Sequence, residues 1–335
     1  MQPAIYGLSG PSLTQSEAAF FREADPAGYI LFKRNCVDPA QLGALTDALR
    51  AIHGRDGLPI LIDQEGGRVA RMQPPAWPAF PKAEAFAALY RIAPMSAIEA
   101  ARVNAQALAA MLGEVGINVN CLPLLDVRQP GASDIIGDRA LGAEPMQVAA
   151  LGRAVLDGMR AGGVVGIVKH IPGHGRAMAD SHVELPVVDA DEAALAADLE
   201  PFTALRNAPM GMTAHVVYTA WDPDRPGSQS PIVIQDIIRG RIGFDGLLMS
   251  DDLGMAALSD GFGERARGVL DAGCDLALHC SGLMDEMVAI ASGVGEMSPQ
   301  AHERLARAMA TISGAPSDIP YEALAEKRDR LLAYA

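Results

Sequence analysis

Residues 164–175 of the chain, VVGIVKHIPGHG, contain the pattern on which the fold depends. A short run of apolar and small residues, 164–168, is followed at once by Lys169 and His170 and then by a segment rich in proline and glycine. Short apolar runs bounded by turn-forming residues are typical of strands buried on both faces, as in a parallel sheet. We therefore predict a buried β-strand with polar side chains at its carboxyl end.

The same pattern recurs along the chain, with alanine-rich helical patterns between the runs. The predicted strands are Ala4–Leu8, Gly28–Phe32, Pro59–Ile62, Asn118–Leu125, Val164–Val168, Gly211–Val217, Leu247–Met249 and Asp275–Leu278. The clearest predicted helices are Pro39–His53, Ala97–Val115, Met146–Ala161 and Ala190–Arg206. Eight strands alternating with helices favour a closed barrel over an open sheet. We predict a single-domain (β/α)8 TIM barrel over residues 1–335, with C-terminal helices from about residue 298.

Composition narrows the class of protein. Half of the residues are hydrophobic and a fifth are charged, so the chain can form a large core, while the net charge of -14 disfavours nucleic acid and anionic membranes as partners. Four cysteines without a CxxC pair indicate reduced thiols. The N-terminus does not resemble a signal peptide, and no apolar stretch approaches the ~18 residues of a membrane span. We expect a cytoplasmic protein that acts as a monomer.

Polar residues stand at the ends of nearly all predicted strands. In a parallel barrel the carboxyl ends of the strands open on one face, which is where catalysis takes place. The residues that we expect to converge there are Asp63, Asp126, Lys169, His170, His215, Asp251 and His279. Any one of them could be a cap or a turn former, but seven together predict a functional pocket.

The segment after His170 holds an acid–histidine pair. Asp180 and His182 are two residues apart in what we interpret as a loop. Asp180 could hold one imidazole nitrogen of His182 and leave the other facing a ligand, the orienting role of a carboxylate beside a catalytic histidine. A purely structural histidine is the alternative, which the acid partner and the loop position make the weaker one.

Two further segments carry charged groups. In Ser250-Asp251-Asp252, one carboxylate could act as a nucleophile while the other caps the next helix, and the pattern leaves open which does which. In the segment 62–71, Asp63 could accept hydrogen bonds from a polar ligand, and Arg68 or Arg71 could reach over it. Arg139, in IIGDR, is another candidate contact. Surface ion pairs are the alternative interpretation of these arginines.

Taken together, these segments resemble a known family. The chain is similar to the bacterial β-N-acetylglucosaminidases of glycoside hydrolase family 3, in the branch that recycles peptidoglycan fragments. The matching segments follow the family's order: LFKRN at 31–35, IDQEGGRVAR at 62–71, LPLLDV at 122–127, IIGDRALGAEP at 135–145, KHIPGHGRAMADSHVELP at 169–186 and MSDDLGM at 249–255. The PGHG and DSH loop is the most specific of them.

The resemblance implies a role for each candidate residue. Asp251 matches the nucleophile of a retaining mechanism, His182 the acid/base, and Asp180 the partner of that histidine. The residues implied to bind the terminal N-acetylglucosamine are Asp63, Arg71, Arg139, Lys169 and His170. The family uses no metal and no organic cofactor, so we expect none. The implied substrate is N-acetylglucosamine linked to an anhydro-muramic acid sugar or its peptide derivative.

Three alternatives remain open at this point. A neutral histidine repels phosphate less than a carboxylate does, so the same pocket could use phosphate as acceptor and act as a phosphorylase. A metal-dependent hydrolase could draw ligands from His170, His174, Asp180, His182 and Asp63, although neither HxH nor HExxH spacing is present. A catalytically inactive sugar-binding protein would keep the pocket without turnover.

Overall fold

The computed structural model describes residues 1–181, 184–314 and 318–334. Its centre is a closed barrel of eight parallel strands, each hydrogen-bonded to its neighbours on both sides. The barrel strands are β1 (Gln2–Gly7), β2 (Pro26–Leu31), β3 (Ile60–Ile62), β4 (Val119–Asn120), β5 (Val165–Ile171), β7 (Met210–Thr213), β10 (Leu247–Asp252) and β11 (Leu276–His279). All eight predicted strands are present, and the predicted (β/α)8 barrel is confirmed.

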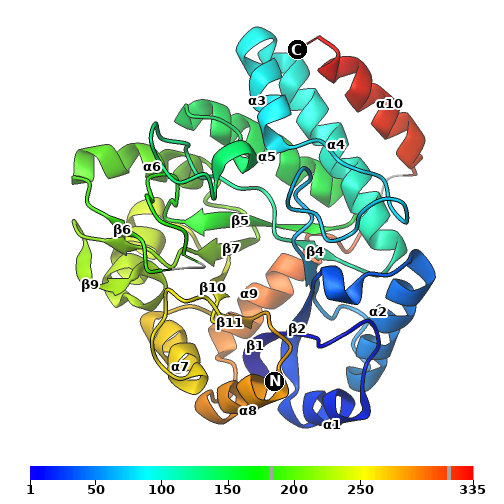
Figure 1. Cartoon of the computed structure of the whole chain (residues 1–335), viewed down its shortest axis with the longest axis vertical. Helices are drawn as coiled ribbons and strands as arrows, with labels where there is room; N and C mark the ends of the chain where they lie inside the picture. Colours follow the sequence, from blue (N-terminus) through cyan, green and yellow to red (C-terminus); the bar gives the residue numbers. More distant parts are fainter. Residues whose placement is uncertain (182–183, 315–317, 335) are drawn as a thin grey trace.

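Helices surround the barrel on its outer side (Figure 1). The helices of the structure, including α9 at one end of the barrel, are α1 (Gln15–Ala24), α2 (Pro39–His53), α3 (Ala83–Ile92), α4 (Pro94–Glu114), α5 (Pro145–Ala161), α6 (Glu192–Ala204), a π-helix (Ile232–Ile242), α7 (Phe262–Ala272), α8 (Met284–Gly293), α9 (Pro299–Ala310) and α10 (Tyr321–Leu332). Short 3-10 turns occur at Lys33–Asn35, Gly137–Arg139 and Gly227–Gln229. Within the described ranges, no helix combines the length and the apolar character that crossing a membrane requires.

Local sequence signals explain where these helices begin and end. In α2, Asp38 accepts a hydrogen bond from the Gln41 amide at 2.8 Å, and Pro39 occupies the first helical position. The helix ends at Gly54, whose φ of 59° lies in the left-handed region that glycine tolerates. These signals flank the predicted helix, and its bounds match the prediction.

Other predicted bounds need correction. The fourth strand was predicted to run to Leu125, but β4 ends at Asn120. The sixth was predicted to reach Val217, but β7 ends at Thr213, before His215. Val217 instead belongs to a small separate sheet of β6 (Val187–Val188), β8 (Val217–Tyr218) and β9 (Asp222–Pro226). Apolar runs can leave the barrel in this way because they are as readily buried beneath loops as within a sheet.

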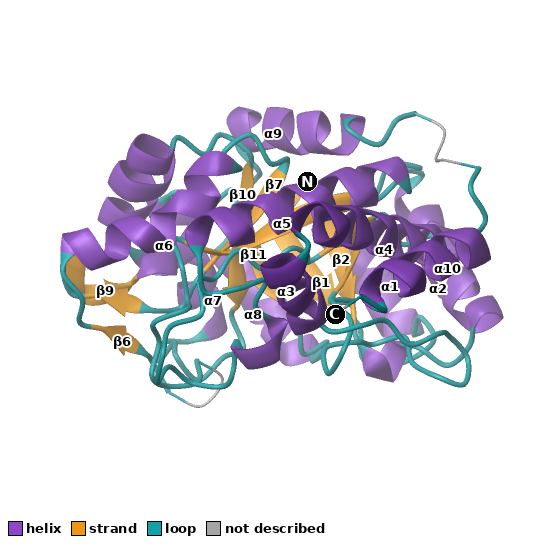
Figure 2. Ribbon diagram, turned by 90° about the horizontal axis from the view of Figure 1, so that it is seen from above, coloured by secondary structure: helices purple, strands orange, loops and turns teal. Residues whose placement is uncertain are grey.

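Two cores result from the alternation of side chains along each strand. Inward-facing residues such as Ile5, Ile167 and Met249 fill the barrel, and the alternate residues pack outward against the helices. Helix α9 lies across one end of the barrel, opposite the long loops (Figure 2), and contributes Leu305 to the inner core. The other end therefore remains open for a site.

Buried ion pairs attach α9 to the closed end. Asp275 directly precedes β11 and accepts hydrogen bonds from Arg239 at 2.9 Å and Arg304 at 3.0 Å. It also accepts one from the Leu248 amide at 2.9 Å, and its side chain is 6% exposed. One carboxylate therefore joins the π-helix, α9 and β10 below the barrel.

We predict that Asp275→Ala lowers the free energy of unfolding by about 3–5 kcal/mol, because it leaves two largely buried guanidinium groups without this partner. Urea unfolding followed by circular dichroism measures the change. The control is Glu326→Ala, which removes an exposed i,i+4 contact to Arg330 and should cost no more than about 0.5 kcal/mol. Equal effects of the two substitutions would contradict the prediction.

Candidate active site

A pocket opens at the carboxyl ends of the barrel strands. Its lining combines charged and polar side chains with apolar ones. The charged and polar lining residues are Asp63, Arg68, Arg71, Arg139, Lys169, His170, His174, Ser181, Asp251 and Asp252, and the apolar ones include Ile30, Phe32, Met212 and Leu278. All five predicted sugar-binding residues and the predicted nucleophile thus line a single pocket.

Strand alternation places three of these side chains inside the barrel. Asp63 follows inward-facing Leu61 by two residues, Lys169 follows Ile167, and Asp251 follows Met249. Because side chains on a strand alternate between its two faces, the residue two positions further on faces the same way. The top layer of the barrel interior is therefore polar, whereas the layers beneath it are apolar.

The loop after β3 is closed by an amide side chain. Gln64 accepts hydrogen bonds from the amides of Arg71 at 2.8 Å and Met72 at 3.0 Å, and donates to the carbonyl of Met72 at 2.9 Å. Its own backbone is held by Asn120 of β4, at 3.0 Å and 2.9 Å. This arrangement brings Arg71 back over Asp63, with 3.2 Å between Nη2 and Oδ2.

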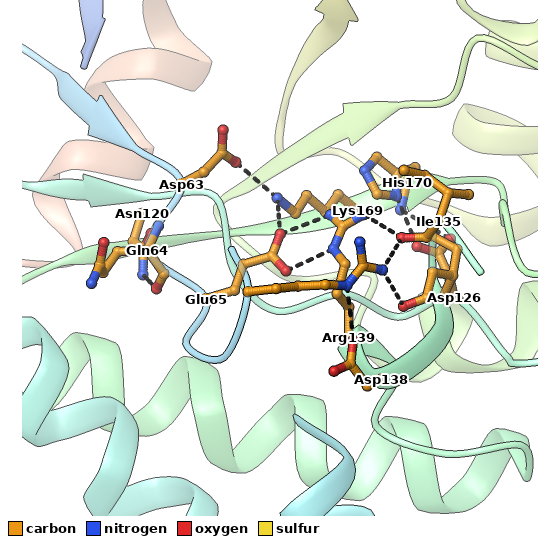
Figure 3. Close-up of polar contacts among 12 residues, drawn as sticks. Asp63, Gln64, Glu65, Asn120, Asp126, Ile135, Asp138, Arg139, Lys169 and His170 are labelled. Carbon is orange, nitrogen blue, oxygen red and sulfur yellow. Dashed lines mark hydrogen bonds and ion pairs between the residues drawn. The ribbon is translucent and has the colours of Figure 1, made fainter. Parts of the chain in front are cut away.

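Lys169 lies between two carboxylates at the base of the pocket (Figure 3). Its Nζ is 2.9 Å from Asp63 Oδ1 and 2.7 Å from Glu65 Oε1, and the side chain is 2% exposed. Burial would raise the pKa of Asp63 and of Glu65, but the nearby cations outweigh it and keep both values below the usual range. Burial alone would lower the pKa of Lys169, yet the two carboxylates raise it. All three groups are therefore charged at neutral pH.

Glu65 was not among the predicted site residues. It also binds Arg139, with Nη2 to Oε1 at 2.8 Å and Nε to Oε2 at 2.9 Å. Glu65 stands two residues after Asp63, between Gln64 and two glycines in a segment expected to form a loop, and this context carried no distinctive signal. Only the reversal of the loop places Glu65 beneath the pocket.

His170 is oriented by a buried carboxylate. Asp126 Oδ2 lies 2.7 Å from His170 Nδ1, and Oδ1 accepts the His174 amide at 2.7 Å. Burial acts to raise the pKa of Asp126, but His170 and the hydrogen bonds lower it to about 2. Asp126 stays ionised and leaves His170 Nε2 available to a ligand. Asp126 was predicted to line the pocket. It does not, and instead it holds His170, which does.

The structure distinguishes the two adjacent aspartates. Asp252 accepts the amides of Gly254 at 2.9 Å and Cys280 at 3.0 Å, so it joins β10 to β11 and shapes the turn. Burial raises its pKa, and the Asp251 charge acts in the same direction. Burial acts to raise the pKa of Asp251, but the field of His170, the hydrogen bond from the Asp252 amide at 2.8 Å and the charge of Lys169 outweigh it, so the pKa is lowered.

The loop after β5 is anchored along its first half. Gly175 approaches Val127 so closely that a Cβ would lie 2.0 Å from the Val127 carbonyl oxygen. Arg176 forms an ion pair with Asp198 of α6, and Ser181 is buried with its Oγ 3.4 Å from His174 Nε2. Asp180 belongs to the same loop, and His182, the predicted acid/base, lies outside the described residues.

Besides Asp126, two more of the residues predicted for the pocket do not line it. His279 contacts Glu286 of α8 at 2.8 Å, because it alternates with inward-facing Leu278 and so points out of the barrel. His215 is fully buried, with Nδ1 2.6 Å from Ser228 Oγ and Nε2 3.0 Å from the Asp252 carbonyl oxygen. Burial lowers the pKa of His215, so it is neutral and supports the backbone beside Asp251.

Both arginines of the loop after β3 reach the pocket, with different contacts. Arg71 lies over Phe32 at 5.0 Å from the ring centroid. Arg68 donates to the carbonyls of Asp134 at 2.7 Å and Ile135 at 2.8 Å and so holds the segment that leads to Arg139. An ionised carboxylate, hydrogen-bond donors and an apolar wall around one pocket suit a sugar ring, which has hydroxyl edges and apolar faces.

A metal site needs several ligand side chains close together, and the structure describes residues 1–181, 184–314 and 318–334. Among them, no group of three or more histidine, cysteine or acidic side chains is placed to hold a metal ion. His170 and His174, which the sequence offered as ligands, both interact with Asp126, one through its ring and the other through its backbone amide. All four cysteines are free thiols, as predicted.

The chain is similar to known proteins over nearly its full length. It is 40% identical over 296 residues to a β-hexosaminidase of Thiobacillus denitrificans, covering 86% of this chain and 81% of the relative, and 40% identical over 284 residues to one of Alkalilimnicola ehrlichii. Among solved structures, NagZ from Neisseria gonorrhoeae in complex with N-trifluoroacetyl-D-glucosamine has a TM-score of 0.85 and 30% identity, covering 99% of this chain and 96% of that one.

A family 3 β-N-acetylglucosaminidase from Paenibacillus gives the same TM-score at 31% identity, covering 98% of this chain and 66% of the other. The model of the glycosyl hydrolase family 3 N-terminal domain matches residues 5–312, which include the barrel except for the first three residues of β1, and all residues that line the pocket. On this match and on the relatives' identity, the chain belongs to glycosyl hydrolase family 3.

Proposed function

We propose that the protein is a retaining β-N-acetylglucosaminidase that removes a terminal, non-reducing N-acetylglucosamine, with Asp251 as nucleophile. The observation that carries the proposal is an ionised carboxylate at the end of β10 that lines the same pocket as the hydrogen-bond donors Lys169, His170 and Arg139. Relatives named β-hexosaminidase and a neighbour holding N-trifluoroacetyl-D-glucosamine support the same sugar class.

The proposed mechanism has two steps. Asp251 attacks C1 and forms a glycosyl-aspartate while His182 donates its proton to the departing oxygen. His182, now neutral, takes a proton from water, which attacks C1 and releases the sugar with its configuration retained. Asp180 would keep the imidazole of His182 in one orientation, and Asp63, Arg71, Arg139, Lys169 and His170 would hold the sugar hydroxyls.

The proposal extends to the natural substrate. The resemblance to the peptidoglycan-recycling branch favours N-acetylglucosamine linked to anhydro-muramic acid, with or without its peptide. We propose that the enzyme acts on it as a monomer in the cytoplasm. Incubation with that disaccharide and with its peptide derivative, followed by chromatography, tests this step. If N-acetylglucosamine were released only from simple aryl glycosides, the proposed natural substrate would be wrong, while the specificity for N-acetylglucosamine would stand.

The same assay separates hydrolysis from its alternatives. Products formed in phosphate buffer and in a phosphate-free buffer should be identical, and N-acetylglucosamine 1-phosphate would instead identify a phosphorylase. Tight binding of N-acetylglucosamine without turnover would identify an inactive sugar-binding protein. Activity that survives a chelator would exclude a required metal ion.

We predict that a 2-deoxy-2-fluoro or 5-fluoro glycosyl substrate labels Asp251, as detected by tandem mass spectrometry of the peptide that holds both aspartates. Asp251→Asn should lower kcat roughly 10⁴-fold or more, since it removes the group that forms the covalent bond. Asp252→Asn is the matched control, because Asp252 is committed to two backbone amides and should keep most of kcat. A label on Asp252 would overturn the assignment.

The pH dependence tests His182. The lowered pKa of Asp251 keeps the nucleophile ionised in mildly acidic solution, so kcat/KM should not fall there on its account. Loss of the His182 proton should make kcat/KM fall as the pH rises past about 6.5, its unperturbed pKa. His182→Ala should remove this alkaline limb.

The leaving group provides a control for His182→Ala. For a substrate with a poor leaving group, the kcat/KM of His182→Ala should be about 10²–10⁴-fold below that of the wild type, because the departing oxygen needs the proton. For a 2,4-dinitrophenyl glycoside, whose leaving group departs without a proton, the kcat/KM of the variant should fall far less. Equal losses on the two substrates would show that His182 is not the acid.

A further inference from the structure

Glu65 lies beneath the sugar-binding side of the pocket. Its side chain is 5% exposed and does not belong to the pocket lining, so it is not placed to contact a ligand. Both of its oxygens are occupied, with Oε1 2.7 Å from Lys169 Nζ and 2.8 Å from Arg139 Nη2, and Oε2 2.9 Å from Arg139 Nε. Figure 3 shows the carboxylate between the two cations.

The two cations come from different parts of the fold. Lys169 stands on β5, whereas Arg139 ends the 3-10 turn Gly137–Arg139, and each contacts Glu65. Glu65 is itself held where its loop reverses, since the amides of Glu65 and Gly66 donate to the Val69 carbonyl at 2.9 Å and 3.1 Å. The carboxylate is therefore a fixed point to which both cations are bound.

We propose that Glu65 is a positioning residue, whose carboxylate holds Lys169 and Arg139 together so that their remaining donors point at the hydroxyl groups of the non-reducing sugar. Two cations at the base of one pocket repel each other, and a carboxylate that touches both offsets this repulsion and fixes their direction. The inference rests on the proposed function, because it assigns Glu65 to the subsite for the sugar.

A neutral replacement shows why charge and shape are both needed. In Glu65→Gln, one carboxylate oxygen becomes an NH2 group, which is a donor facing the donors of Lys169 or Arg139. With its oxygen at the position of Oε1, the amide could still accept from Lys169 Nζ and Arg139 Nη2, but its NH2 group would then face Arg139 Nε, and the charge that offsets the two cations would be lost. Glu65→Asp keeps the charge but is one methylene shorter, and it should reach one cation better than the other.

A substrate panel tests the proposal. We compare kcat and KM for an aryl β-N-acetylglucosaminide and its 3-, 4- and 6-deoxy analogues in the wild type, Glu65→Gln and Glu65→Asp. Glu65→Gln should lower kcat/KM for the parent substrate about 10²-fold, the scale of a displaced positioning group. Glu65→Asp should lie between Glu65→Gln and the wild type.

The deoxy analogues separate positioning from a general loss of structure. If Lys169 and Arg139 act on particular hydroxyls, the penalty of Glu65→Gln should shrink on at least one analogue that lacks such a hydroxyl, as coupled partners do in a double-mutant cycle. Equal penalties on the parent substrate and on every analogue, or wild-type activity in Glu65→Gln, would overturn the proposal.

Glu99→Gln is the matched control. Glu99 of α4 also pairs with one arginine, Arg102, through two hydrogen bonds of 2.8 Å and with one lysine, Lys327, but lies outside the pocket. This variant should leave kcat/KM unchanged on every substrate. Thermal unfolding shows whether Glu65→Gln folds. If it does not, the penalties of Glu65→Asp on the parent substrate and on the deoxy analogues test the proposal in the same way.

Failure of the proposed function gives a different result. It would appear as absent turnover in the wild type, whereas failure of the positioning role leaves wild-type turnover intact. In the first case, calorimetric binding of N-acetylglucosamine and its deoxy forms to the wild type and to Glu65→Gln still tests Glu65. Equal loss of affinity for every sugar would again overturn the inference.

Discussion

The closed parallel barrel imposes one constraint on which the whole site depends: every second side chain of a strand must point inward. The inward positions are apolar through most of the barrel, where Leu61, Ile167 and Met249 pack together. The next inward position on each of these strands is charged, and it lies where the barrel opens to solvent. Catalytic groups can stand there because they are supported by a rigid sheet and still accessible to a ligand.

Burying charge at the end of the barrel requires compensation. Uncompensated charges are costly to remove from water, so each buried cation is matched with a carboxylate. Lys169 is shared by Asp63 and Glu65, and Arg139 is bound by Glu65. The same logic applies at the closed end, where Asp275 binds Arg239 and Arg304. Buried ion pairs thus position the side chains of the pocket at one end of the barrel and attach α9 at the other.

Much of this could be predicted from the sequence, because local pattern and strand polarity are enough to indicate a parallel barrel. The eight apolar runs are all barrel strands, and α2 begins and ends where Asp38 and Gly54 indicate. The five sugar-binding candidates and Asp251 line one pocket, as predicted. The prediction was wrong for Asp126, His215 and His279, which do not line the pocket. A position at the end of a strand does not by itself say on which face a side chain lies, and His279 points out of the barrel.

Sequence determined the kinds of residue at the site and their order, since short-range patterns of apolar, turn-forming and charged residues are written in the chain itself. Tertiary structure alone decided which carboxylates become partners. Glu65 reaches Lys169 and Arg139 only after its loop reverses, and Asp252 is separated in role from Asp251 only when the turn after β10 places it against Cys280. Such pairings join residues 28 to 104 positions apart, and contacts at that range depend on how the barrel closes.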